Sequence, residues 1–90
     1  MYAKGKIKGS TMFIIKPSGS AKKVELAGDF NGWKPTAMKK QKDGSYVLSV
    51  PLDKGAHEYK FLVDGQWLVD PDNNTWSVNK FGTMNSVAQV

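Results

Sequence analysis

The chain has 90 residues, the size of one small domain, and its 40% hydrophobic content is typical of a folded protein rather than a disordered one. It has no cysteine, which excludes disulfides and thiolate metal sites and leads us to expect a reducing, cytoplasmic location. The net charge of +5 comes from lysine alone, and the absence of arginine argues against nucleic acid as a partner.

The N-terminal stretch, Met1 to Gly9, alternates lysine with glycine and lacks the apolar centre of a signal peptide. No apolar run in the sequence approaches the roughly 18 residues that a membrane span needs, so we expect no membrane partner. We expect residues 1–10 to be a loose N-terminal segment and residues 11–90 to form one module.

Short β-strands separated by turn residues follow in chain order, and no segment has a sustained helical period. The expected strands cover residues 11–16, 24–30, 46–52, 57–63, 66–69 and 85–90, with 38–42 as a further candidate. Asp70 to Asn74 is expected to be a turn or loop because of its composition. Six or seven short strands at this spacing predict an all-β fold, an immunoglobulin-like β-sandwich of two antiparallel sheets.

The strand over residues 57–63 is followed by Asp64-Gly65, a pair that favours a two-residue hairpin turn. With that turn Leu62 faces Trp67, and directly paired side chains share one face of a sheet. The uncharged face is predicted to point into the core, and it consists of Tyr59, Phe61, Val63 and Leu68. The opposite face would carry Lys60 and Trp67 outward, unless a loop one residue longer or shorter reverses the assignment.

The three tryptophans differ in what the sequence says about them. An exposed Trp67 would present about 150–250 Å² of mostly apolar surface, which usually marks a binding site, although packing under a loop or against a partner is the alternative. Trp33 follows Asn31-Gly32 after a strand, where a large ring either caps the core or stands free. Trp76 lies near an Asp- and Asn-rich stretch and is assigned no role.

Four motifs in order resemble one family, and together they span nearly the whole chain. They are Val24 to Trp33 (VELAGDFNGW), His57 to Trp67 (HEYKFLVDGQW), Asp70-Pro71, and Gly82 to Asn85 (GTMN). This pattern is similar to the glycogen-binding domain of the AMP-activated protein kinase β subunit. The broader group is carbohydrate-binding module family 48, which also supplies N-terminal modules of isoamylases and glycogen branching enzymes.

The resemblance implies an early-set immunoglobulin-like sandwich that binds α-1,4-linked glucans such as glycogen, starch or maltooligosaccharides without catalysis and without a cofactor. It implies that Trp33 and Trp67 stack on glucose rings, and that Lys60, Thr83 and Asn85 hydrogen-bond sugar hydroxyls. The kinase branch usually has leucine where Phe81 stands, and phenylalanine keeps an apolar contact while being bulkier. Whether the chain is free-standing or part of a larger protein stays open.

Catalytic and metal chemistry find little support in the sequence. His57 is the only histidine and opens a strand, so a structural role is favoured over a Ser-His-Asp set. A two-carboxylate glycosidase is the sharpest enzymatic rival, but Asp43 and Asp64 each precede glycine in an expected turn. Asp70 and Asp72 do not have the spacing of an EF-hand loop. The rival from another class is a protein-interaction module that docks onto a glucan-active enzyme or a kinase partner through its exposed tryptophans.

Overall fold

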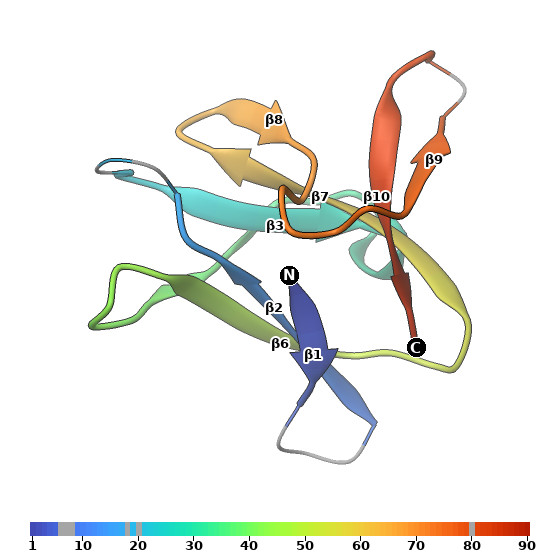
Figure 1. The fold of residues 1–90 in the computed structure, drawn as a ribbon, viewed down its shortest axis with the longest axis horizontal. Coiled ribbons are helices and arrows are strands. Elements are labelled where there is room, and N and C mark those ends of the chain that lie inside the picture. The colour runs from blue at the N-terminus through green and yellow to red at the C-terminus, as the bar shows by residue number, and fades with distance from the viewer. Residues whose placement is uncertain (6–8, 18, 20, 80) are drawn as a thin grey trace.

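The computed structural model describes residues 1–90 except 6–8, 18, 20 and 80 (Figure 1). Its described part contains short strands and one 3-10 helix, η1. In chain order these elements are β1 (Tyr2–Lys4), β2 (Ser10–Ile15), β3 (Val24–Gly28), η1 (Asp29–Asn31), β4 (Thr36–Ala37), β5 (Lys39–Lys40), β6 (Tyr46–Pro51), β7 (Ala56–Val63), β8 (Gln66–Leu68), β9 (Trp76–Val78) and β10 (Met84–Gln89).

The strands form two antiparallel sheets that pack face to face, which confirms the predicted sandwich (Figure 1). One sheet has the order β1-β2-β6-β5. The other has the order β4-β3-β7-β10-β9, and β8 pairs with β7 off this path. Strand β7 is the centre of the second sheet, because β3 lies along one side of it and both β8 and β10 pair with it as well.

The core between the sheets is aromatic. Phe13 of β2 and Tyr59 of β7 come from opposite sheets, and their ring centroids lie 4.7 Å apart in an edge arrangement. Phe30 stacks on Phe13 at 5.4 Å, and Phe61 meets Tyr59 edge-on at 5.7 Å. Such ring pairs add about 0.5–1.5 kcal/mol beyond the area they bury, and the Phe13–Tyr59 pair joins the two layers.

A buried polar cluster lies beside the aromatic core. Asp70, whose exposed fraction is 1%, accepts a hydrogen bond from the Tyr59 hydroxyl at 2.6 Å, and its backbone N–H donates to the Ser86 hydroxyl at 2.7 Å. Asn73 donates to the Tyr59 hydroxyl oxygen at 3.0 Å. Burial, together with the bond to Asp70, raises the pKa of Tyr59 far above its ordinary value. The loop over residues 70–74 is where it was predicted, but two of its polar side chains are structural groups of the interior.

Several predicted elements differ from the structure. Residues 2–4 are not loose: they form β1, in which Tyr2 pairs with Phe13 and its ring lies 6.3 Å from Tyr59. The aromatic ring anchors a segment whose lysines and glycines suggested mobility. Strand β3 ends at Gly28, earlier than predicted, because η1 begins at Asp29, and β9 was not predicted. Leu68 is 40% exposed rather than buried, although its pairing with Phe61 is as predicted.

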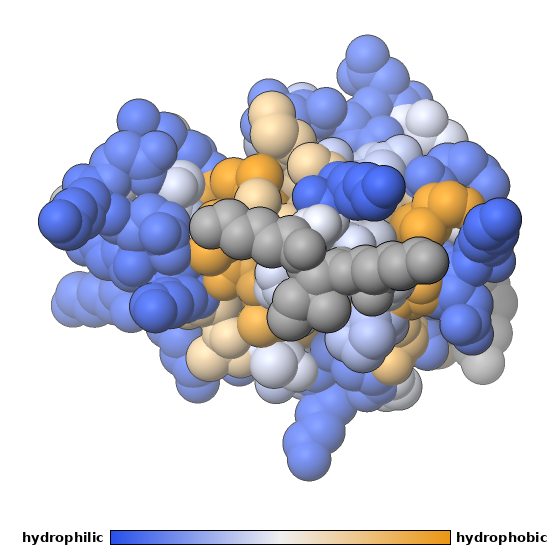
Figure 2. Space-filling model, turned by 90° about the horizontal axis from the view of Figure 1, so that it is seen from below, coloured by the Kyte–Doolittle hydropathy of each residue, from blue (hydrophilic) through white to orange (hydrophobic). Residues whose placement is uncertain are grey.

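The face of the molecule seen from below has hydrophobic areas near its middle and hydrophilic residues around them (Figure 2). A hollow of about 460 Å³ is lined in part by Tyr2 of β1, by Leu52 and by Val90.

Within the described ranges, the fold contains no helix of the length and apolarity that crossing a membrane would need.

Candidate functional site

The hairpin of β7 and β8 sets which side chains face outward. Asp64 and Gly65 both have positive φ angles, 48° and 83°, as a two-residue turn of this type requires. Leu62 pairs with Trp67, so Trp67 shares the outer face of the sheet, while Tyr59 and Phe61 are fully buried beneath it. The sequence prediction of an outward Trp67, 52% exposed, is confirmed.

Lys60 occupies a gap in the pairing of β7. On one side of β7, β10 pairs with residues 56–59 and β8 pairs with residues 61–63. Lys60 lies between these two stretches, on the outer face, where its backbone pairs with Ala27 of β3. In Figure 1, β8 and the β9–β10 hairpin extend from β7 on the side away from β2 and β6.

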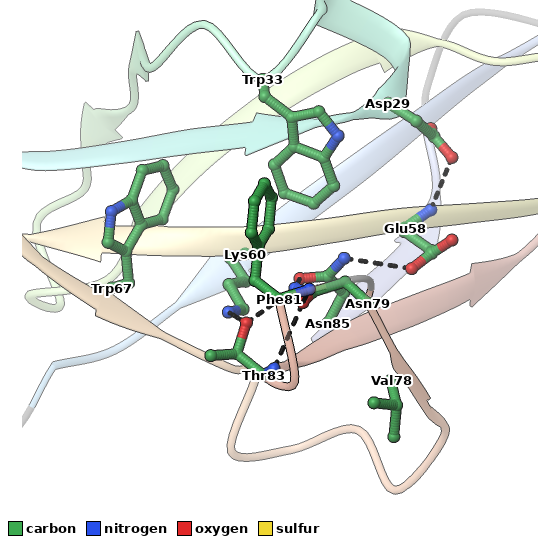
Figure 3. A pocket seen from close by; sticks show the side chains of 10 residues that line it. All are labelled: Asp29, Trp33, Glu58, Lys60, Trp67, Val78, Asn79, Phe81, Thr83 and Asn85. Atoms are coloured by element: carbon green, nitrogen blue, oxygen red, sulfur yellow. Dashed lines mark hydrogen bonds between the residues drawn. The ribbon is translucent and has the colours of Figure 1, made fainter.

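An open hollow of about 910 Å³, here called the trough, lies over this outer face. Its lining residues come from η1 and the segment that follows, from β7, β8, β9 and β10, and from the loop between β9 and β10. They are Asp29, Trp33, Glu58, Lys60, Trp67, Val78, Asn79, Phe81, Thr83 and Asn85. In Figure 3 Trp67 lies at one end of the trough and the carboxylates of Asp29 and Glu58 at the other.

Trp33 reaches the trough through a strained turn. The side chain of Asn31 accepts a hydrogen bond from the Gly28 N–H at 2.9 Å and donates to the Leu26 carbonyl at 3.3 Å, which folds the chain back after β3. Gly32 and Trp33 then both have left-handed φ angles, 66° and 61°. A bulky residue with positive φ is uncommon and costs on the order of 1–3 kcal/mol, and such strain gathers at binding sites. The turn leaves Trp33 37% exposed, so it stands over the trough and does not cap the core.

The third aromatic wall is Phe81, which is 80% exposed in the loop between β9 and β10. Asn79 holds this loop through its side-chain oxygen, which accepts from the N–H groups of Phe81 at 3.0 Å and Thr83 at 3.2 Å. The Asn79 amide nitrogen donates to the Thr83 hydroxyl oxygen at 2.7 Å and to the Asn85 side-chain oxygen at 3.2 Å. The hydrogen bonds of the Asn79 side chain therefore stabilise the loop that places Phe81 at the trough.

Polar groups lie along the floor of the trough. The Lys60 ammonium donates to the Thr83 hydroxyl oxygen at 3.3 Å, and the Asn85 amide donates to Glu58 Oε1 at 3.0 Å. Asp29 accepts from the backbone N–H of Glu58 at 2.9 Å. These groups give the trough both hydrogen-bond donors and acceptors beside its apolar walls. A sugar ring likewise combines hydroxyl groups on its rim with an apolar C–H face.

The structure brings all six residues named from the sequence, Trp33, Lys60, Trp67, Phe81, Thr83 and Asn85, to the lining of one hollow. Four lining residues were not named: Asp29, Glu58, Val78 and Asn79. Glu58 had a signal in the sequence, because it alternates in phase with Lys60 on β7. The place of Asn79 depends on loop conformation, for which the sequence has no comparable pattern.

Two other side chains singled out earlier lie outside the lining of the trough. Trp76 of β9 is 51% exposed, and its indole N–H donates to the Asn73 carbonyl at 3.0 Å. The His57 Nε2 atom lies 2.7 Å from the Asp53 carbonyl oxygen, and Nδ1 lies 3.6 Å from Asp29 Oδ1. His57 thus ties the start of β7 to the preceding turn, a structural role of the kind that the sequence favoured.

An immunoglobulin-like sandwich with an open trough, walled by exposed aromatic rings and floored by hydrogen-bonding groups, defines a carbohydrate-binding β-sandwich module. The family described as the glycogen recognition site of AMP-activated protein kinase matches residues 11–90. The chain belongs to this family, and glucan recognition is the function that membership assigns to it.

Individual relatives agree with this assignment. The β-1 subunit of 5'-AMP-activated protein kinase from Sus scrofa is 36% identical over 77 residues, which are 86% of this chain and 62% of that protein. Protein PTST homolog 2, chloroplastic, from Arabidopsis thaliana is 48% identical over 62 residues, 68% of this chain and 12% of that protein. The chain therefore spans less than two thirds of these relatives.

A solved structure shares the fold. The maltogenic amylase from S. marinus matches 100% of this chain with 16% of its own, at a TM-score of 0.77 and 21% identity. At that identity the likeness concerns the β-sandwich alone.

Proposed function

We propose that the trough binds an α-1,4-linked glucan, such as glycogen, starch or a maltooligosaccharide, by stacking glucose rings on its aromatic walls. The observation that carries the proposal is that Trp33 and Trp67, both exposed, line one hollow together with Lys60, Thr83 and Asn85. The apolar C–H face of a glucose ring covers an indole, and the hydroxyls on its rim meet the polar floor.

The expected affinity follows from the area of the rings. An indole that loses about 80 Å² of apolar area to sugar gains about 2 kcal/mol at ~25 cal/mol per Å². Lost mobility of the sugar and the protein offsets much of the gain from two such contacts. Hydrogen bonds between sugar hydroxyls and the polar floor add to the remaining gain, and we expect a Kd between about 1 µM and 1 mM, or roughly −8 to −4 kcal/mol.

We propose that binding occurs without catalysis. The two carboxylates at the end of the trough already serve the fold, since Asp29 accepts from the Glu58 N–H and Glu58 accepts from Asn85. A hydrolase would need one of them as a proton donor and the other as a base or nucleophile. Incubation with maltoheptaose should release no shorter sugar, as chromatography of the mixture would measure.

A partner and a cellular location are proposed next, the partner from the relatives of the chain. Because kinase subunits are among them, we propose that the domain brings an associated enzyme or kinase subunit to the glucan. The cysteine-free sequence keeps the cytoplasm as the proposed location.

Calorimetric titration with maltoheptaose tests the proposed site, and the chain offers a matched control. Trp67→Ala removes a ring that lines the trough, and Trp76→Ala removes an equally exposed ring that does not. We expect Trp67→Ala to weaken binding about thirtyfold, the equivalent of ~2 kcal/mol, and Trp76→Ala to leave the Kd unchanged. Equal effects of the two substitutions would place the sugar elsewhere.

The class of glucan is tested by comparing maltoheptaose with cellohexaose. An α-1,4 chain curls, so successive rings can meet aromatic walls that stand at different places around a hollow. A β-1,4 chain is a flat ribbon and suits a row of coplanar rings. Similar Kd values for the two sugars would contradict the proposed preference.

A further inference from the structure

The side chain of Asn79 has a fixed orientation that follows from its partners. Its Oδ1 position faces two backbone N–H groups, those of Phe81 and Thr83, at 3.0 and 3.2 Å. A backbone N–H only donates, so the atom that faces both groups must be the amide oxygen. The amide nitrogen is therefore the atom that faces the Thr83 hydroxyl at 2.7 Å.

The partners of Asn85, at the other end of this hydrogen-bond network, fix the orientation of its side-chain amide as well. Glu58 Oε1 lies 3.0 Å from the Asn85 amide, and a carboxylate at neutral pH accepts hydrogen bonds and donates none. Asn85 must turn its nitrogen to Glu58, which leaves its oxygen facing Asn79 at 3.2 Å. Two independent partners, a carboxylate and a pair of backbone N–H groups, thus agree on how every amide in the network points.

The orientation of the Asn79 amide determines whether the Thr83 hydroxyl can donate a hydrogen bond to a ligand or accept one from it. Its hydroxyl oxygen receives hydrogen bonds from the Asn79 amide at 2.7 Å and from the Lys60 ammonium at 3.3 Å. A hydroxyl has two acceptor positions and one proton to donate, and both acceptor positions are taken. The remaining capacity of Thr83, which lines the trough, is to donate its proton.

We propose that Asn79 is a positioning residue that fixes Thr83 as a hydrogen-bond donor toward the bound sugar. Resting on the proposed glucan function, the proposal names the chemistry of one contact within that site. The ligand atom that meets Thr83 is an acceptor, namely the oxygen of a sugar hydroxyl, of the ring or of the glycosidic link. Asn79 does this through its bond to the Thr83 hydroxyl and through the loop that presents Phe81.

The substitution Asn79→Asp separates the two tasks of this side chain. A carboxylate keeps an oxygen toward the N–H groups of Phe81 and Thr83, so the loop should keep its shape. It replaces the donor toward Thr83 and toward the Asn85 side-chain oxygen by an acceptor. The bond to Asn85 is lost, and the Thr83 proton should turn from the sugar to the new carboxylate. We expect a Kd for maltoheptaose about tenfold weaker at pH 7, the usual worth of one such hydrogen bond, with little change in melting temperature.

The pH profile distinguishes this mechanism from a structural role. Among the residues that the structure describes, the charged groups that line the trough are Lys60 and Glu58 of β7 and Asp29 of η1, and they are shared by the wild type and the variant. The N–H groups of Phe81 and Thr83 would hold the pKa of the new carboxyl below its usual value of about 4, and protonation below that pH gives it back one donor. The ratio of the variant Kd to the wild-type Kd should therefore shrink as the pH falls from 7 to below about 4, whereas damage to the loop would leave that ratio constant.

Thr83→Val supplies a second arm, because it removes the hydroxyl at an exposed position. We expect it to weaken binding about tenfold, and adding Asn79→Asp to it should cost little more, since the two changes abolish the same contact. The inference is overturned if Asn79→Asp or Thr83→Val binds as the wild type does, or if their effects simply add. Absence of binding by the wild-type domain would instead refute the proposed function itself.

Discussion

Lys60 shows how a single residue at the site combines charge with shape. It lies between the stretches of β7 that pair with β8 and with β10, and its ammonium contacts Thr83 across the trough. Its four-carbon stem runs along the outer face of the sheet, so packing and hydrogen bonding are carried by different parts of the side chain.

Replacing Lys60 with methionine should therefore affect binding and spare stability. Methionine keeps an unbranched apolar stem and loses the donor, so we expect the Kd for maltoheptaose to rise about tenfold. The melting temperature should change by less than about 4 °C, the shift that roughly 0.5 kcal/mol gives in a domain of this size. Calorimetry and thermal unfolding followed by circular dichroism measure the two quantities, and a large loss of stability would show that the ammonium serves the fold.

Asp43 permits a prediction about pH at the residue scale. The Ser45 hydroxyl donates to its carboxylate at 2.6 Å and the Ser45 N–H at 2.9 Å, and these bonds hold the pKa of Asp43 below its usual value. A carboxyl whose folded pKa is depressed stabilises the fold above its unfolded pKa of about 4, and this contribution is lost as the pH falls through the folded pKa. Ser45→Ala should raise the Asp43 pKa toward its ordinary value, as an NMR titration would detect. An unchanged pKa would mean that the backbone N–H alone sets it.

At the scale of elements, the junction between β3 and η1 is tightly fitted against β7. Gly28 has an extended φ of −169°, so its backbone conformation is open to any residue. Space is what requires glycine there, because a Cβ would lie 2.6 Å from the Glu58 carbonyl oxygen and against the ring of Phe30. The same junction carries Asp29 and leads through the strained turn to Trp33.

Gly28→Ala should therefore weaken both the fold and the site. The backbone of β7 cannot yield cheaply, and forced overpacking of this kind costs about 1–3 kcal/mol. We expect a melting temperature lower by roughly 4–8 °C per kcal/mol, together with weaker maltoheptaose binding as Trp33 shifts. If both quantities match the wild type, β3 can move away from β7 at no cost and the tight fit is only apparent.

The elements also show why some features were predictable. Alternation along β7 and the Asp64-Gly65 turn were enough to predict that Trp67 points outward and that Phe61 is buried. The same reasoning was wrong for Leu68, because alternation identifies a face but not whether the opposite sheet extends far enough to cover it. The left-handed backbone of Trp33 and the framing role of Asn79 depend on hydrogen bonds across loops, which no periodic pattern encodes.

At the scale of the whole molecule, a 90-residue sandwich depends on a few large side chains. Phe13, Tyr59 and Phe61 are fully buried, and the Tyr59 ring contacts the other two. The Tyr59 hydroxyl donates to Asp70 and accepts from Asn73. The sequence predicted the sandwich and its aromatic core. It did not predict that Asp70, beside a proline in an apparent turn, would be buried.

Phe61→Ala should destabilise the whole domain and Leu68→Ala should not. The two residues pair across one hairpin, but Phe61 is fully buried while Leu68 is exposed. Removing the buried ring leaves a cavity worth about 3–5 kcal/mol, a large share of the stability of a small domain, whereas the exposed leucine should contribute under about 1 kcal/mol. Denaturant unfolding measures both, and similar losses would mean that the two side chains are packed alike in solution.

The central claim, that the trough is the glucan site, is tested most directly by NMR of the three indole N–H groups during a titration with maltoheptaose. Trp33 and Trp67 line the trough and Trp76 does not, so each spectrum contains its own control. We predict that the indole signals of Trp33 and Trp67 shift together and saturate at the calorimetric Kd, while the signal of Trp76 stays in place. A shift confined to Trp76, or saturation with Trp33 and Trp67 unmoved, would contradict the claim.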